Sequence, residues 1–154
     1  MSTATLGLAE ITAAVESVVD PEIPVLTIDD LGILRSVEDE EGRLVVTITP
    51  TYSGCPAMRQ IEDDIVAAVQ RLGVEEIEVR TTYAPAWTTE WISEEGHRKL
   101  AEFGIAPPTE PLEVVCPRCA GGSPHLVSRF GSTACKALMV CSRCGEPFDY
   151  FKKH

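Results

Sequence analysis

Four of the six cysteines in this 154-residue chain form two Cys-x-x-Cys pairs, Cys116 with Cys119 and Cys141 with Cys144. Two such turns can present four thiolates to one tetrahedral ion, for which zinc is the default and a mononuclear iron the main rival. A module of about 40 residues has too small a core to fold unaided and needs such a cross-link. The spacing therefore predicts a four-cysteine zinc ribbon over residues 112–154, with a structural or docking role.

A fifth cysteine, Cys55, lies in the stretch Thr49-Pro50-Thr51-Tyr52-Ser53-Gly54-Cys55-Pro56, between a strand-like and a helix-like run. Proline suits the first helical turn, so Cys55 should lie at the helix N-terminus. Free N–H groups and the helix dipole lower the pKa of a thiol there. We expect this local effect to outweigh the diffuse acidic charge of the chain, which makes Cys55 a candidate reactive thiolate. The alternative is a packing cysteine in a turn. Thr51 adds a small hydroxyl donor beside it.

The other candidate residues have less specific patterns. Cys135 lies outside both pairs and is an inert core thiol, a second reactive thiol or a displaced ligand. His125 and His154 are further candidate ligands, although the four paired cysteines already complete a site. Trp87 and Trp91 are expected to pack on the core, with a place beside Cys55 or on a docking surface as the alternatives.

Composition limits the class of protein. Hydrophobic residues make up 44% and charged residues 24% of the chain, as in globular proteins. No stretch approaches the roughly 18 uncharged apolar residues of a membrane helix, and the N-terminus lacks the pattern of a secretory leader, so we expect a cytoplasmic protein without membrane contacts. The formal net charge of −11 argues against nucleic-acid binding, which needs a basic face.

The charge is unevenly distributed along the chain. Residues 1–111 contain seven Lys/Arg and 21 Asp/Glu, whereas residues 112–154 contain six and three. The change coincides with the proline-rich segment Ala106-Pro107-Pro108-Thr109-Glu110-Pro111, which is typical of a semi-rigid linker. We therefore expect a first domain over residues 1–105, a linker over 106–111 and a second domain over 112–154.

Hydrophobic periodicity predicts the elements that position these residues. Asp20-Pro21 should end the first helix and open an acidic loop, and Gly73 and Gly104 should end the next two helices. Helices are expected at residues 8–19, 57–72 and 93–103, and strands at 31–37, 43–49 and 76–81. This order predicts an α+β fold, a small αββαβ(α) domain whose sheet is covered by helices on one face, followed by the zinc ribbon.

Several segments resemble known families. Asp20-Pro21-Glu22-Ile23-Pro24-Val25, together with the stretch around Cys55, is similar to the small domain of iron–sulfur cluster assembly factors that include the SufT-like proteins. Further segments resemble the PaaD (also PaaJ) family, accessory proteins encoded with the phenylacetyl-CoA epoxidase. These segments are Pro85–Ser93, Ile105–Pro108, the two cysteine pairs, Phe130–Leu138 and Glu146–Lys152. The resemblance as a whole covers almost the entire chain, from about residue 8 to residue 152.

The resemblance implies a non-enzymatic accessory factor of bacterial phenylacetate catabolism. Its expected task is to bring an iron–sulfur cluster, or iron, to a component of the multicomponent oxygenase. The implied client is the iron–sulfur reductase, with the general iron–sulfur assembly machinery as a further partner. The family's cysteine corresponds to Cys55 and its acidic motif to Asp20, Pro21 and Glu22. The implied site is therefore Cys55, which holds the cargo transiently, in one cleft with Asp20 and Glu22 and beside Thr51.

Two functional classes stay open at this point. In the first, the protein is an assembly factor that acts through Cys55; in the second, it is a non-catalytic oxygenase component whose ribbon docks the other components. A third and weaker alternative is a thiol oxidoreductase that uses Cys55 with Cys135. Neither the Glu-x-x-His pairs of a di-iron bundle nor a glycine-rich dinucleotide loop occurs, so no independent oxygenase is expected. A homodimer is also left open.

Overall fold

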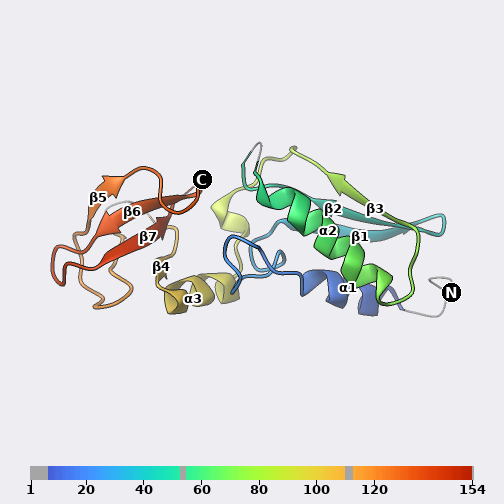
Figure 1. Cartoon of the computed structure of the whole chain (residues 1–154), viewed down its shortest axis with the longest axis horizontal. Helices are drawn as coiled ribbons and strands as arrows, with labels where there is room; N and C mark the ends of the chain where they lie inside the picture. The colour runs from blue at the N-terminus through green and yellow to red at the C-terminus, as the bar shows by residue number, and fades with distance from the viewer. Residues whose placement is uncertain (1–6, 53–54, 110–112, 154) are drawn as a thin grey trace. The chain divides into compact units, whose positions relative to one another are not determined.

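The computed structural model describes residues 7–52, 55–109 and 113–153 (Figure 1). The chain divides into two compact units, Met1–Trp87 and Thr88–His154. Each unit contains its own sheet, of three strands in the first and four in the second. This mixed architecture confirms the predicted α+β fold.

The first unit is built on a three-stranded sheet in the order β1-β2-β3. β1 and β2 are antiparallel, whereas β3 runs parallel to β2 after the crossover through α2. Glu41 and Gly42 join β1 to β2 with φ values of 53° and 87°, which is the backbone of a tight hairpin turn. The elements are α1 (Leu8–Glu16), β1 (Leu34–Glu40), β2 (Arg43–Ile48), α2 (Ala57–Gln70) and β3 (Ile77–Thr81).

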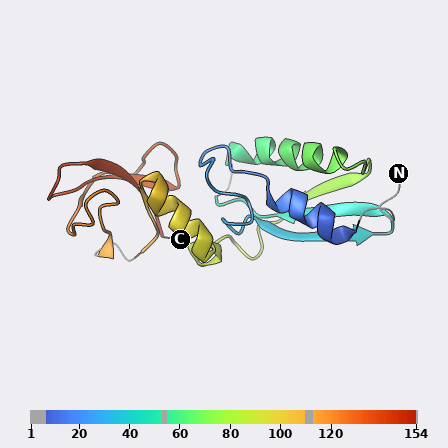
Figure 2. The ribbon, with the colours of Figure 1, turned by 90° about the horizontal axis from the view of Figure 1, so that it is seen from below.

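Both helices of this unit lie on one face of the sheet (Figure 2), because α1 contacts β1, α2 contacts β3, and the helices contact each other. Ile61, Ile65 and Val69 repeat every four residues along α2 and are fully buried, which gives the helix one apolar stripe. Gly73 follows with a φ of 90°, a conformation that suits glycine after a helix. At 14 residues α2 is the longest helix of the described segments, and none of these is a candidate membrane span.

The segment between α1 and β1 differs from the expectation. The strand predicted at residues 31–37 begins only at Leu34, and the loop before it contributes to the core. Its apolar side chains are almost fully buried, namely Ile23, Leu26, Ile28, Leu31 and Ile33. Short hydrogen-bonded turns hold the loop, and its burial pattern follows neither helical nor strand periodicity.

The second unit contains a sheet in the order β4-β7-β6-β5. Its helix begins after Ser93, whose hydroxyl accepts a hydrogen bond from the N–H of Gly96, and ends at Gly104 with a φ of 91°. The elements are a 3-10 turn η2 (Thr89–Trp91), α3 (Glu94–Phe103), β4 (Ile105–Ala106), β5 (His125–Ser128), β6 (Lys136–Val140) and β7 (Pro147–Phe151).

The division between the two units falls earlier than the expected boundary at residue 105. α3 contacts β4, and β4 pairs with β7, so the predicted third helix belongs with the ribbon sheet. Ala106, expected as the first linker residue, lies within β4 and is buried. A two-residue strand paired to a distant segment leaves no periodicity in the sequence, which explains the difference.

Candidate metal centre and thiol site

The four paired cysteines converge within the second unit. Their Sγ atoms all lie within 4.8 Å of one another. The Cys116 and Cys144 sulfurs are 3.8 Å apart, and those of Cys119 and Cys141 are 3.6 Å apart. Four sulfurs bound at about 2.3 Å to one tetrahedral zinc ion lie about 3.8 Å from each other. The sulfurs therefore fit one tetrahedral ion, and the four cysteines form a metal-binding cluster on a zinc-ribbon fold.

Backbone N–H groups converge on two of these sulfurs. The N–H of Gly121 donates to Cys119 Sγ at 3.3 Å. The N–H groups of Arg143 and Cys144 donate to Cys141 Sγ at 3.3 and 3.4 Å. Such hydrogen bonds stabilise the thiolate, which is the form that binds a metal ion.

The two turns have the same backbone design. Ala120 and Gly145 each follow a cysteine pair with positive φ, 60° and 78°. The N–H of Ala120 donates to the carbonyl of Cys116, and that of Gly145 to the carbonyl of Cys141. The left-handed residue bends each turn back on itself, so that both sulfurs of a pair face the same side.

The four thiols perturb one another's ionisation. Hydrogen bonds from the N–H of Cys144 and then Arg143 outweigh burial and lower the pKa of Cys141 to about 6. At Cys144 the N–H of Glu146 lowers the pKa, but burial and the sulfurs of the other three cysteines raise it to about 11. Clustered thiols cannot all become anions without a compensating cation. A divalent ion would supply that charge and cross-link the ribbon.

Cys55 lies directly before α2, as expected, with Pro56 as the N-cap residue. The thiol is half-buried. The N–H of Cys55 donates to the carbonyl of Tyr52, and the Cys55 carbonyl accepts from the N–H of Met58, both at 3.3 Å. The sulfur accepts hydrogen bonds from the N–H of Ala57 and the Tyr52 hydroxyl. The backbone thus fixes the thiol against the first turn of the helix.

The predicted lowering of the Cys55 pKa is wrong. Burial raises the pKa above the ordinary 9.0, and the carboxylates of Glu22 and Asp20 raise it further, while Ala57 and Tyr52 act in the opposite direction. Burial disfavours the thiolate, and nearby negative charges do the same. The prediction left out burial, which is the largest influence on this thiol, and it treated the acidic charge as diffuse although Glu22 and Asp20 both act on the thiol.

The acidic loop has a defined fold that explains part of its composition. The Oδ1 atom of Asp20 accepts from the N–H groups of Glu22 and Ile23 at 2.6 and 3.2 Å. The N–H of Asp20 donates to the carbonyl of Leu26, which closes the loop. Asp20 is 6% exposed and organises the loop, whereas Glu22 is partly exposed. Both act electrostatically on Cys55.

Thr51, the fourth residue of the predicted thiol site, lines a cavity of about 210 Å³. Tyr52, Tyr83 and Trp87 form aromatic walls of this cavity. The Trp87 indole N–H donates to the carbonyl of Leu31 at 2.8 Å, so this tryptophan packs on the core and borders the cavity. Thr49 also lines it, and its buried hydroxyl has no hydrogen-bond partner among the described residues. Nothing in the sequence marked Thr49 or Tyr83 as site residues.

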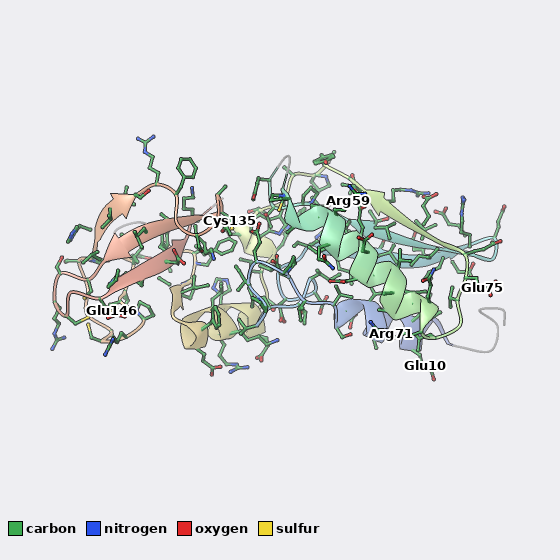
Figure 3. All side chains as sticks on the ribbon, viewed as in Figure 1. Glu10, Arg59, Arg71, Glu75, Cys135 and Glu146 are labelled. Carbon is green, nitrogen blue, oxygen red and sulfur yellow. The ribbon has the colours of Figure 1, made fainter. Side chains whose placement is uncertain are left out.

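Cys135 does not join the metal cluster. It precedes β6, at the opposite end of that strand from the Cys141 turn (Figure 3). Its side chain is 4% exposed, and its sulfur lies 3.0 Å from the Thr133 hydroxyl. His125 lies exposed on β5 and is not part of the cluster, while His154 lies outside the described residues. The burial of Cys135 counts against a second reactive thiol.

The comparisons with known proteins cover both units. Residues 8–80 match the family model of an iron–sulfur cluster assembly protein, and residues 104–152 match that of the PaaD zinc β-ribbon domain. A relative in Escherichia coli K12, named as a putative subunit of 1,2-phenylacetyl-CoA epoxidase, is 47% identical over 93% of this chain and 91% of its own length. The chain belongs to the PaaD family. The resemblance seen in the sequence is thereby confirmed.

The first part of the chain is shared beyond the PaaD family. A Bacillus subtilis protein named Fe-S protein maturation auxiliary factor YitW is 39% identical over 54% of this chain and 82% of its own length. A solved domain of unknown function from Bacillus anthracis, DUF59, has a TM-score of 0.55 and 32% identity, covering 64% of this chain and 93% of that domain. This chain therefore combines the zinc ribbon with a small domain that also occurs outside the PaaD family.

Proposed function

We propose that the protein is a non-catalytic maturation factor for a phenylacetyl-CoA epoxidase, which helps an iron–sulfur cluster, or iron, to reach the iron–sulfur reductase component. The proposal rests on Cys55, a half-buried thiol that precedes α2 and on which the Glu22 and Asp20 carboxylates act electrostatically. This arrangement lies in the part of the chain that matches iron–sulfur assembly proteins. The general assembly machinery is the expected source of the cargo.

A thiol beside carboxylates suits transient binding of an iron-containing cargo. Thiolate is the preferred ligand of iron–sulfur clusters, and carboxylates favour a cationic guest. Because the pKa of Cys55 is raised, the empty site keeps a protonated thiol and loses that proton when the cargo binds. Binding is therefore opposed by proton release, which favours transfer over permanent retention.

The four-cysteine site of the ribbon is proposed to hold zinc permanently, with iron as the rival ion. Its four sulfurs already lie within 4.8 Å of one another, and a closed set of four protein ligands is typical of structural sites. The ion supplies a cross-link here, and the ribbon takes no part in cargo transfer.

The decisive experiment measures the cluster content of the reductase produced together with this protein. Wild-type protein is expected to give full iron and sulfide content, Cys55→Ser a deficient reductase, and Cys135→Ala a wild-type result. Full loading with Cys55→Ser contradicts the proposal. A deficient reductase with Cys135→Ala, at normal levels of folded protein, would instead favour the alternative of a thiol oxidoreductase.

A docking component of the oxygenase is the second candidate, favoured because the Escherichia coli relative is named as a subunit of the epoxidase itself. This candidate predicts that the protein stays bound to the assembled oxygenase at equal stoichiometry. It also predicts that Cys55→Ser leaves both the complex and its clusters intact. Co-purification of the complex with that variant separates the two candidates.

A further inference from the structure

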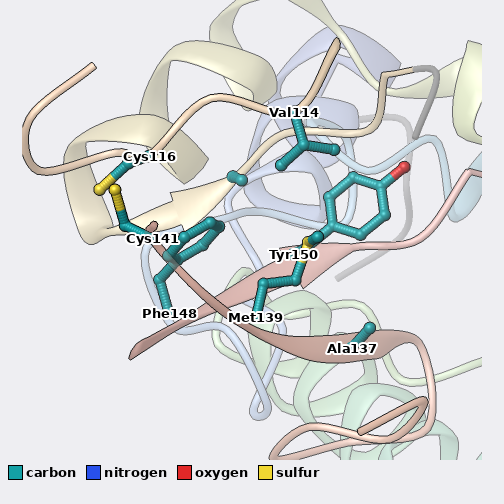
Figure 4. Packing of buried hydrophobic residues seen from close by; sticks show 8 residues of the cluster. Val114, Cys116, Ala137, Met139, Cys141, Phe148 and Tyr150 are labelled. Carbon is teal, nitrogen blue, oxygen red and sulfur yellow. The ribbon is translucent and has the colours of Figure 1, made fainter. Parts of the chain in front are cut away.

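The ribbon unit contains a cavity of about 320 Å³ that neither the metal cluster nor the proposed function uses. Its apolar walls come from both sheet residues and the exposed rim. Met139 and Tyr150 lie on adjacent strands with Val114 and Ala137 nearby (Figure 4). The apolar lining residues are Val114, Leu126, Phe130, Ala137, Met139 and Tyr150, and the cationic ones are Arg129 and Lys152. Its volume is at the lower end of the range for small-molecule pockets.

The loop between β5 and β6 is built to hold one rim of this cavity. The N–H of Gly131 donates to the carbonyl of Lys136 at 2.8 Å. Asp149 on β7 approaches Gly131 so closely that a Cβ there would lie 2.4 Å from its Oδ1 atom. The Ser132 hydroxyl donates to the other Asp149 oxygen, which lies 4.0 Å from the buried Lys136 ammonium. These contacts fix the loop that carries Phe130.

Phe130 is an unusual surface residue, because its ring is 64% exposed and yet held in place. The Lys152 ammonium lies 4.6 Å from the ring centroid, a cation–π distance, and donates to the carbonyl of Arg129 at 2.9 Å. Leu126 beside it is 54% exposed. An aromatic and an aliphatic side chain are thus presented to solvent at the edge of an apolar cavity.

The charge at this cavity is positive, although the chain as a whole is acidic. No carboxylate lines the cavity among the described residues, and the nearby Asp149 is engaged by Lys136 and Ser132. Within the described segments the Arg129 guanidinium makes no hydrogen bond or ion pair. The Lys152 ammonium uses one donor on the protein, and an ammonium has three. Both cations retain donors for an anion.

We propose that this cavity binds a small aromatic carboxylate, with the ring among Phe130, Met139 and Tyr150 and the carboxylate against Arg129 and Lys152. Aromatic rings pack well on other rings and on the sulfur of methionine, and Arg binds a carboxylate through two parallel donors. The volume of about 320 Å³ admits one ring with a short side chain. The site is independent of Cys55 and of the proposed maturation role.

The test is a titration of the zinc-loaded, isotope-labelled full chain with phenylacetate, followed by the backbone amide resonances. Phenylacetate should shift resonances of β6, β7 and the loop around Phe130 in a saturable way. Phenethylammonium, with the same ring and the opposite charge, and acetate, without the ring, should not. Raising the ionic strength should weaken binding, because the two cations are near the surface.

Variants assign the contacts. Arg129→Gln and Lys152→Gln should each weaken phenylacetate binding roughly fivefold or more, since each removes a charge-assisted hydrogen bond. Phe130→Ala should weaken it to a similar degree. Arg98→Gln on α3 makes the same charge change at a residue that does not line the cavity, and should bind as the wild type does. Amide spectra and zinc content show that each variant is folded.

Three results would overturn the proposal. The first is the absence of saturable shifts with phenylacetate. The second is equal binding of phenethylammonium, or unchanged affinity in both charge variants, which would leave only a non-specific apolar surface. The third is a concentration-dependent shift of the same resonances without ligand, which would show that a second copy of the chain covers this face.

Discussion

Burial, two carboxylates and the first turn of α2 all act on the thiol of Cys55. Burial is the strongest influence and raises the pKa, and the hydrogen bonds from Ala57 and Tyr52 reverse only part of it. A helix N-terminus is therefore not sufficient to make a reactive thiolate when the sulfur is half-buried beside an acidic loop. A raised pKa leaves less thiolate at neutral pH, which slows oxidation and alkylation and would suit the transfer site proposed for Cys55.

The balance at this thiol can be tested by two opposing substitutions. Glu22→Gln removes a negative charge that raises the Cys55 pKa, so the thiolate fraction and the alkylation rate at pH 8 should increase by a few fold. Tyr52→Phe removes a hydrogen bond that lowers the pKa, so the rate should fall. Because the wild-type pKa is raised above its ordinary value, the labelling rate should still increase with pH between pH 7 and 9.

The measurement is iodoacetamide labelling of the zinc-loaded protein, with Cys55 identified by peptide mass. Cys135 serves as the internal control, because its buried sulfur should label slowly in all three proteins. A wild-type rate already level between pH 7 and 9 would mean a thiolate at neutral pH and would contradict the raised pKa. If both variants are labelled at the wild-type rate, neither side chain acts on the sulfur.

At the scale of elements, regular periodicity made most of the fold predictable. The four-residue repeat of Ile61, Ile65 and Val69 identified α2, and glycine placed the ends of α2 and α3 within a residue or two. The metal cluster was equally predictable from the sequence, because each cysteine pair lies in a short local turn. In these cases the residues that determine the structure lie close together in the sequence.

The missed features depend on contacts between distant segments. The loop after α1 buries Ile23 and Leu26, although its sequence has neither helical nor strand periodicity. The strand β4 forms only because β7 pairs with it. The influence of Glu22 on Cys55 requires the loop to return to the front of α2, which no local pattern indicates. The Thr49 hydroxyl, which has no hydrogen-bond partner among the described residues, likewise becomes a candidate only once the residues around the cavity are in place.

The loop between β5 and β6 gives a test of one close approach. In Gly131→Ala the new Cβ would force Asp149 away and weaken its contacts with Ser132 and the buried Lys136. Overpacking of this kind, with a buried cation losing its partner, should cost about 1–3 kcal/mol. Thermal unfolding of the zinc-loaded protein, followed by amide signals of β6, should therefore occur at lower temperature.

Gly122→Ala is the matched control for this loop, because a Cβ there meets no atom within 4 Å. It should leave the stability of the ribbon within about 0.5 kcal/mol of the wild type. If the two variants unfold alike, the approach of Asp149 to Gly131 is not a constraint on this loop.

At the scale of the whole molecule, the two units differ in charge and in what stabilises them. Residues 1–87 contain five Lys/Arg and 16 Asp/Glu, and residues 88–154 contain eight of each, so the net charge of −11 resides in the first unit. The first unit buries a core of helices on a sheet, whereas in the second the buried cluster itself includes Cys116 and Cys141. Metal binding and core formation are therefore coupled in the ribbon.

This coupling predicts that loss of the ion divides the molecule into folded and unfolded parts. Cys141→Ser removes a buried sulfur and one of four ligands, so the ribbon loses both its cross-link and part of its core. Amide hydrogens of β5, β6 and β7 should then exchange rapidly, while those of α2 and β2 keep their protection. Removing the ion from the wild type with a strong chelator should give the same pattern, and restoring zinc should reverse it.

Elemental analysis of the untreated protein should find a single zinc or iron per chain. The control variant Cys55→Ser, which leaves the ribbon intact, should keep both the ion and the protection. Uniform loss of protection throughout Cys141→Ser would instead show that the two units fold as one cooperative structure.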